Sequence, residues 1–148
     1  MLLRNDRALL ALDILLDIGF HAGRGAEVTG AADIAERLGA QRRGIEPILQ
    51  ALGRAGLLES LRGPRGGYRL ARPPRAISLL AAVDAVLEGD APPEAANRLS
   101  EAATRPLWRS FEAELRERLA MQTLADLLRR AAAAGLRRPV TEPLDFVI

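Results

Sequence analysis

The chain has 148 residues, of which 49% are apolar and 3% aromatic, so it is long enough for one domain with a core of Leu, Ala, Ile and Val. It contains no cysteine, which excludes disulfides. All 21 basic residues are arginine and the formal net charge is +2. Residues 37–75 hold nine arginines but only two acidic residues, whereas residues 76–148 hold nine arginines and eleven acidic residues. A positive field concentrated on one segment is typical of nucleic-acid-binding proteins.

The N-terminal segment is apolar from Ala8 to Ile18, although Asp13 and Asp17 interrupt it. This run is too short to span a bilayer and lacks the layout of a signal peptide, so we expect a cytoplasmic protein. The only histidine, His21, has no partner at ligand spacing, which favours a structural role over a metal site. Apolar residues at helical spacing predict an amphipathic first helix. Its apolar face is expected to hold Leu9, Leu12, Leu16, Gly19 and Phe20.

Two short helices are predicted next, over about residues 30–38 and 42–55. Thr29 can cap the first helix, and Gly39 can end it in the left-handed conformation that a residue without Cβ adopts most easily. Pro47 lies early in the second helix and removes one hydrogen bond from its interior unless the helix begins only just before it. The apolar faces are expected to hold Ala31, Ile34, Ala35 and Leu38 in the first helix and Ile45, Ile48, Leu49 and Leu52 in the second.

A β-hairpin is predicted around residues 60–68, which read Ser-Leu-Arg-Gly-Pro-Arg-Gly-Gly-Tyr. Short apolar runs on both sides of a turn rich in Gly and Pro indicate two strands. The tip carries Arg62 and Arg65 but no carboxylate, and Gly66 and Gly67 allow close approach of the backbone to another surface. Such a tip suits a phosphate backbone or a narrow minor groove. Two helices followed by this hairpin predict a winged helix-turn-helix, with the second helix in the major groove and the hairpin as the wing.

These segments resemble the IscR-type (Rrf-two) family of winged-helix regulators, which includes IscR, NsrR, RirA and CymR. The resemblance rests on residues 32–39, 45–52, 55–58, 60–68, 70–72, 77–78 and 107–109. It implies a mainly α fold with a β-hairpin wing and a long C-terminal helix that crosses its copy in a homodimer. The implied function is transcription regulation, by a repressor bound to a palindromic operator. The implied DNA-binding positions are Gln41, Arg42, Arg43, Glu46 and Pro47 in the helix and Arg62, Gly63, Arg65, Gly66, Gly67 and Tyr68 in the wing.

The second half of the chain is predicted to hold a long helix from Pro106 to about Gln122 and a last helix capped by Thr123 and Asp126. One apolar stripe on the long helix, beyond a complete winged-helix core, needs a partner. The resemblance implies a second copy, whereas the alternative is packing on its own domain. The stripe holds Leu107, Trp108, Phe111, Leu115 and Leu119. We divide the chain into a winged helix-turn-helix domain (1–88), a linker in place of a cluster-binding loop (89–104), dimerisation helices (105–135) and an extended tail (136–148).

Sensors of this family usually hold an iron–sulfur cluster on three cysteines that precede the Leu-Trp-Arg motif. In this chain the last cysteine position falls at about Ala102, and the additional ligand position at about Arg105. Thiolates hold such clusters and carboxylates replace them poorly, so we expect no cluster, no metal and no other cofactor. No Ser–His–Asp, Cys–His or phosphate-loop arrangement can be placed either, so we expect no enzyme.

The tail ends in Asp-Phe-Val-Ile, which is similar to the end of serine acetyltransferases that dock into O-acetylserine sulfhydrylase (cysteine synthase). CymR, the cluster-free member of the resembled family, takes that synthase as its partner. The resemblance therefore implies control of cysteine or sulfur metabolism, with Phe146, Val147 and Ile148 as partner-binding residues. Two alternatives stay open: a regulator of the same fold that senses a small ligand near the dimer helices, and an interaction protein that does not bind DNA and uses its tail to regulate an enzyme.

Overall fold

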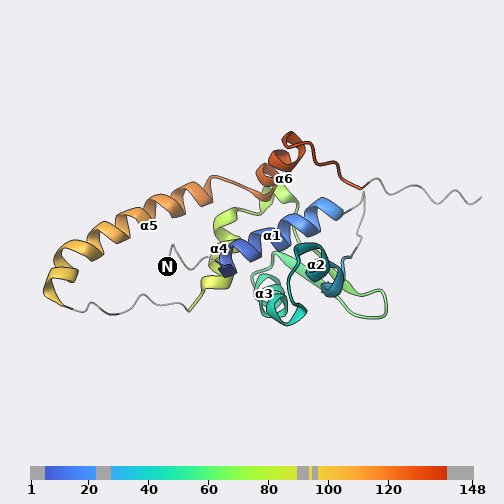
Figure 1. Ribbon diagram of the computed structural model, residues 1–148, viewed down its shortest axis with the longest axis horizontal. Coiled ribbons are helices and arrows are strands. Elements are labelled where there is room, and N and C mark those ends of the chain that lie inside the picture. The colour runs from blue at the N-terminus through green and yellow to red at the C-terminus, as the bar shows by residue number, and fades with distance from the viewer. Residues whose placement is uncertain (1–5, 23–27, 90–93, 95–96, 140–148) are drawn as a thin grey trace, which may run out of the picture.

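The computed structural model describes residues 6–22, 28–89, 94 and 97–139, and it is mainly helical with one antiparallel β-hairpin (Figure 1). This confirms the predicted fold class. In chain order the elements are α1 (Asp6–His21), α2 (Ala31–Leu38), α3 (Arg42–Arg54), β1 (Leu58–Leu61), β2 (Gly67–Leu70), η1 (Pro74–Ala76), α4 (Leu79–Leu87), η2 (Ser100–Thr104), α5 (Arg105–Ala120) and α6 (Leu124–Ala133). Within the described ranges, no helix combines the length and the apolar character that crossing a membrane requires.

Helix α1 lies at the centre of the molecule, where it contacts α2, α3 and β2 as well as α4 and α6 (Figure 1). Of the predicted apolar face, Gly19 is buried and three further residues pack partly buried against the core, namely Leu12, Leu16 and Phe20. The prediction was wrong at Leu9, which is exposed. The helix is apolar on most sides, so leucine spacing alone does not fix its rotation, and the fully buried face is centred on Ile14, Leu15 and Ile18. The buried residues are Ala8, Ala11, Ile14, Leu15, Asp17, Ile18 and Gly19.

Helix α2 buries Ile34 and Ala35 as predicted, and Gly39 ends it with a φ of 62°. The predicted cap was wrong, because Gly30 is the N-cap residue and Thr29 takes part in a strand pairing. The Thr29 N–H donates to the Tyr68 carbonyl at 2.9 Å, and the Tyr68 N–H donates back to the Thr29 carbonyl at 2.8 Å. Thr29 therefore joins the hairpin to the start of the helix-turn-helix.

Helix α3 is confirmed with its apolar stripe, which is wholly buried. The helix begins at Arg42, so Pro47 lies inside it and supplies no N–H to the carbonyl of Arg43. Arg43 is exposed, so water can satisfy that carbonyl. The side chains of the stripe enter one core with those of α1, α4 and α6.

Helix α6 completes this core and does not belong to the projecting arm. Its Leu124 and Leu128 are buried with the core, and the predicted capping box is present. The Thr123 N–H donates to Asp126 Oδ2 at 2.7 Å. The two helices of the segment 105–135 thus lie in different environments, because α6 packs on the winged-helix body.

Helix α5 forms an arm that leads away from this body (Figure 1). The arm begins before the predicted boundary at residue 105, because residues 100–104 form a π-helical turn that runs directly into α5. Pro106 supplies no backbone N–H, and the N–H of Arg105 reaches the carbonyl of Ser100, five residues back. None of the residues of α5, all of which the structure describes, is buried.

Candidate nucleic-acid interface

Helix α3 buries one face and presents the other to solvent. Its buried stripe fixes the rotation of the helix, so the N-terminal residues lie at the surface. The predicted recognition positions Gln41, Arg42, Arg43 and Pro47 are exposed, and Glu46 is half-buried. A helix that presents its N-terminal side chains in this way can enter the major groove of duplex DNA.

The first turn of α3 is electropositive for two reasons. The N-cap residue is Gln41, and its side chain makes no capping hydrogen bond to a described residue, so backbone N–H groups of this turn are open to an outside acceptor. Arg42 and Arg43 add two positive charges to the positive end of the helix dipole, and the turn itself holds no acidic residue. This end of the helix suits a phosphate oxygen.

Arg42 and Glu46 form an ion pair on the exposed side of α3. Arg42 Nε donates to Glu46 Oε1 at 3.1 Å, one helical turn away. Both side chains are largely exposed, so the pair adds little to stability. Glu46 keeps its second carboxylate oxygen, which can accept from the N4 amino group of cytosine. Arg42 keeps its terminal N–H groups, which can donate to guanine or to phosphate.

The wing is an antiparallel hairpin in which Glu59 lies opposite Arg69. Arg69 Nε donates to Glu59 Oε2 at 2.7 Å, and this hydrogen bond lowers the pKa of Glu59 below its ordinary value. The two opposite charges of this pair cancel on the paired strands of the hairpin. At the tip, Arg62 and Arg65 are exposed, and neither has an ion-pair partner among the described residues. The positive charge of the wing is therefore concentrated at its tip.

The glycines of the wing are required by contacts within the chain. A Cβ at Gly66 would lie 2.4 Å from the Leu61 carbonyl oxygen, and one at Gly67 would lie 2.5 Å from the Thr29 carbonyl oxygen. Gly63 has a φ of 113°, which side-chain-bearing residues rarely adopt. Gly66 and Gly67 were predicted from close approach to DNA and Gly63 from the family resemblance, but internal geometry gives each of the three glycines a sufficient reason.

A partly buried ion pair between Asp17 and Arg37 connects α1 to α2, and we call it the Asp17–Arg37 clamp. Arg37 donates to both carboxylate oxygens of Asp17, from Nε to Oδ1 at 2.9 Å and from a terminal nitrogen to Oδ2 at 2.7 Å. These hydrogen bonds raise the pKa of Arg37 above its ordinary value. His21 Nδ1 donates to the Asp17 carbonyl at 2.9 Å. Sequence reasoning missed the clamp because its two residues lie 20 positions apart in the chain, on different helices.

The chain does not fit an iron–sulfur cluster. It contains no cysteine, and the last cysteine position and the additional ligand position of the family pattern fall at an exposed Ala102 in the π-helical turn and at a half-buried Arg105. An alanine has no donor atom, and a guanidinium carries positive charge at all ordinary pH values. Among the described residues, no three His, Cys, Asp or Glu side chains lie where they could share a metal ion.

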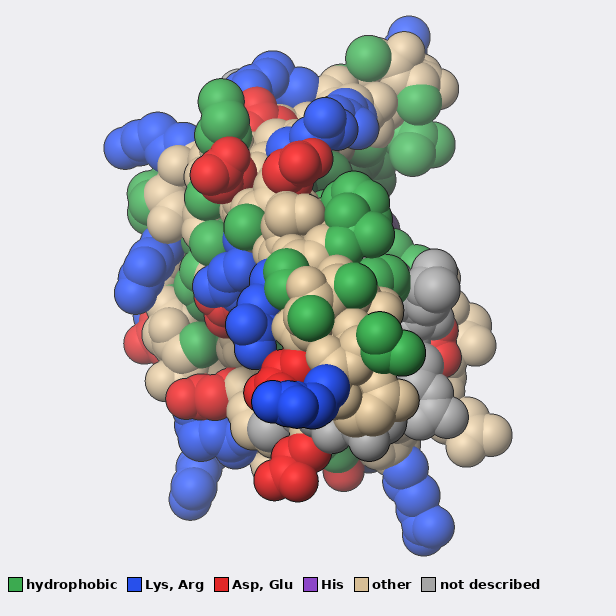
Figure 2. Space-filling view, turned by 90° about the vertical axis from the view of Figure 1, so that its left-hand side faces the viewer, with side chains coloured by type: hydrophobic (Ala, Val, Ile, Leu, Met, Phe, Trp, Pro, Cys, Tyr) green, Lys and Arg blue, Asp and Glu red, His purple; other side chains and the backbone are tan. Residues whose placement is uncertain are grey.

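The apolar stripe of α5 lies at the surface of the single chain. Leu107, Trp108 and Phe111 are 56%, 39% and 47% exposed, and Leu115 and Leu119 are half-buried. Hydrophobic side chains gather among charged ones on the end of the molecule from which the arm projects (Figure 2). The Arg116 guanidinium donates to both oxygens of Asp84, at 2.7 and 3.0 Å, and this pair links the arm to α4. Packing on its own domain therefore does not account for the N-terminal half of the stripe, which holds Leu107, Trp108 and Phe111.

The partner-binding residues predicted in the tail, Phe146, Val147 and Ile148, lie outside the described residues. The described part of the predicted tail, residues 136–139, is exposed.

A family model named Rrf2 and described as an iron-dependent transcriptional regulator matches residues 4–130. Protein rrf2 of Nitratidesulfovibrio vulgaris is 32% identical over 125 residues, which cover 80% of this chain and 82% of that protein. The solved structure of IscR from T. potens is similar with a TM-score of 0.72 and 30% identity, and the match covers 90% of this chain and 91% of that one. The structure of CymR (YrzC), the global cysteine regulator of B. subtilis, gives a TM-score of 0.69 and 28% identity over 84% of this chain and 95% of that one.

Proposed function

Because this chain belongs to the Rrf2 family of DNA-binding transcriptional regulators, we propose that it acts as a homodimeric repressor of a palindromic operator. The observation that carries the proposal is the exposed apolar stripe of α5, on an arm outside the body that holds α3 and the wing. An arm with this stripe joins two copies, and each copy then contributes one electropositive helix and one wing.

The stripe has the composition of an interface core. Trp108 and Phe111 are of the residue types that are enriched in protein–protein interfaces, and Leu107 extends the same surface. Left in water, these side chains form a continuous apolar surface that is uncommon on a monomer. Pairing with the same stripe of a second copy removes it from water and produces a two-fold axis.

The two-fold axis sets the form of the operator. Two copies of α3 related by this axis read two half-sites of inverted sequence, about one helical turn apart. Within each half-site, Glu46 selects a cytosine, and Arg42 and Arg43 contact guanine or phosphate. The wing tip, through Arg62 and Arg65, holds the phosphate backbone or the adjacent minor groove.

Sedimentation and duplex binding test the proposal together. The protein should sediment as a dimer without DNA, and a host operator fragment, identified by sequencing the DNA that co-purifies with the protein, should shift it to a dimer–duplex complex. Binding should weaken steeply with salt, because each phosphate contact releases counterions. A protein that shows no salt-dependent affinity for any duplex is the interaction protein of the alternative hypothesis, and this outcome would reject the proposal.

Without thiolates for a cluster, a partner protein or a small ligand must supply the signal that controls DNA binding. A second candidate function is therefore regulation by a partner enzyme of cysteine metabolism. The similarity to CymR, named the global cysteine regulator of its organism, favours it. In this candidate Phe146, Val147 and Ile148 dock into cysteine synthase. Titration of the full chain into the host synthase should give a complex, and O-acetylserine should compete with the chain and dissociate it. The Ile148→Ala variant should bind the synthase at least tenfold more weakly. No complex, with or without operator DNA, would discard this partner.

A further inference from the structure

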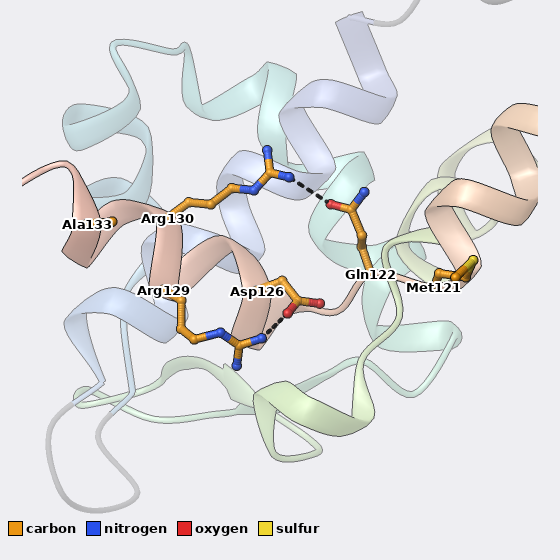
Figure 3. A pocket seen from close by; sticks show the side chains of 6 residues that line it. All are labelled: Met121, Gln122, Asp126, Arg129, Arg130 and Ala133. Atoms are coloured by element: carbon orange, nitrogen blue, oxygen red, sulfur yellow. Dashed lines mark hydrogen bonds and ion pairs between the residues drawn. The ribbon is translucent and has the colours of Figure 1, made fainter.

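A hollow of about 480 Å³ opens at the junction where α5 ends and α6 begins (Figure 3). Its volume falls in the range of small-molecule sites, but it is shallow and open to solvent, so a ligand would be held from one side. The hollow is separate from the DNA-facing elements, because α6 and α3 pack on different sides of α1 (Figure 1). It is lined by Met121, Gln122, Asp126, Arg129, Arg130 and Ala133.

Among the described residues, Arg130 is the arginine of this hollow that makes no ion pair, although the charge of Asp126 lies one helical turn away. Asp126 accepts from the Thr123 N–H at 2.7 Å and pairs with Arg129, and the Thr123 hydrogen bond lowers the pKa of Asp126 below its ordinary value. Arg130 instead donates to the neutral amide oxygen of Gln122 at 3.3 Å. Figure 3 shows these as two separate pairs, although Asp126, Arg129 and Arg130 all belong to the face of α6 that lines the hollow. The Arg130 contact is long and satisfies one of the five N–H donors of the guanidinium.

We propose that the hollow binds a small organic anion, a carboxylate that carries an apolar group. The Arg130 guanidinium can take a carboxylate in the two-pronged geometry that this side chain favours, and the Gln122 amide can turn its N–H donors to the same ligand. Met121, which is 83% exposed, and the methyl group of Ala133 offer the apolar group a surface to cover. The paired Asp126 faces Arg129 and repels the ligand less than a free carboxylate does.

The position of the hollow gives its ligand a mechanical role, and this step rests on the proposed function. Residues 122–124 form the joint between the arm and the body. The Leu79 N–H donates to the Gln122 carbonyl, and the Leu124 N–H donates to the Ile77 carbonyl, each at 2.9 Å. A ligand held by Gln122 and Arg130 therefore braces the joint that sets the direction of α5. In a dimer joined through α5, that direction sets the distance between the two recognition helices.

Binding is tested without DNA, so its failure is distinguishable from failure of the proposed function. The probe is phenylbutyrate, and phenylbutylamine is the control of the same shape and opposite charge. Titrated into the full chain, phenylbutyrate should shift the NMR signals of the Gln122 side-chain amide and the Arg130 Nε–H saturably, and phenylbutylamine should not. The Arg130→Gln variant should bind phenylbutyrate at least tenfold more weakly. Arg137→Gln removes an exposed charge outside the hollow and should bind within twofold of the wild type.

Three results would overturn the assignment. They are a lack of saturable shifts, equal binding of the amine, and equal losses in the Arg130 and Arg137 variants, which would indicate a general charge effect. The double variant Glu142→Gln, Asp145→Asn tests whether a carboxylate from the tail of the chain itself occupies the hollow. We expect it to bind phenylbutyrate like the wild type. A tenfold gain in affinity would make the tail the occupant and reject a free small anion. Operator affinity measured with saturating phenylbutyrate should change in the wild type but not in Arg130→Gln.

Discussion

Replacing Gly67 by alanine tests whether the wing owes its glycines to internal packing or to DNA. A Cβ at this position would lie 2.5 Å from the Thr29 carbonyl oxygen and 2.7 Å from its carbonyl carbon, both of which are backbone atoms. Strand β2 must move away to relieve this contact, and the two hydrogen bonds between Thr29 and Tyr68 are then lost. At about 1 kcal/mol net for each bond, Gly67→Ala should lower the free energy of unfolding by about 2 kcal/mol.

The matched control is Gly53→Ala in α3, where an added Cβ meets only the Leu58 carbonyl oxygen at 3.9 Å, an ordinary contact. Alanine is the better helix former, so this variant should gain up to about 1 kcal/mol. The free energies of unfolding of the two variants, measured in urea, should therefore differ by about 3 kcal/mol. The dependence of the free energy on urea is compared as well as the midpoint. If Gly67→Ala unfolds like the wild type and loses only DNA affinity, the packing argument is refuted and close approach to DNA is the reason for the glycine.

Three further variants test the interface, the arm and the last helix. Arg65→Ala should weaken binding to every duplex and lower the salt slope by about one. Arg138→Ala removes an exposed charge that follows α6 and lies outside the wing, and it should leave the slope unchanged. Equal slopes for the two variants would remove the wing from the contact. Phe111→Asp should keep its helix content, because α5 buries no residue within the chain. It should nevertheless sediment as a monomer and bind the operator much more weakly, because the new charge has no partner in the interface. A variant that stays dimeric would exclude the stripe from the interface. The pKa of Asp126 is lower in the folded protein than its ordinary value of 3.8. The wild type should therefore be more stable than Asp126→Ala above pH 3.8, and this difference in stability should disappear as the pH falls through the lower folded-state pKa. Urea midpoints of the two proteins across that acidic range measure this difference, and a difference that persists at the acid end would contradict the capping role.

Features that depend on neighbours in the sequence were predictable, and features that depend on distant contacts were not. The buried stripe of α3, the left-handed Gly39 and the capping box of Thr123 and Asp126 all follow from spacings of four residues or fewer. The rotation of α1 could not be predicted in this way, because a helix that is apolar on most sides has no clear hydrophobic periodicity. The strand pairing of Thr29 joins residues 29 and 68, so local capping preference was misleading there. The hollow at the α5–α6 junction is made by tertiary placement of residues whose local pattern indicates only a solvated helix face.

The place of α1 limits how any signal at the arm can reach DNA. Helix α1 contacts the reading elements α2, α3 and β2 and also α4 and α6, which hold the joint of the arm. The Asp17–Arg37 clamp fixes α2 to α1, so these two helices move together or not at all. A change in α5 therefore cannot tilt α3 within its own domain without disturbing a close-packed core, which is costly. In the proposed dimer it can change the distance between two intact domains at lower cost, because α5 buries no residue in the body and is held there through its contacts with α4, which include an exposed ion pair, and through one short joint. For the proposed dimer we therefore expect control by half-site spacing and not by deformation of the reading helix, and the two are distinguished by operators whose half-sites are moved apart by single base pairs. Under spacing control, a ligand at the joint changes which spacer length binds best. Under deformation of α3, every spacer length loses affinity in the same proportion.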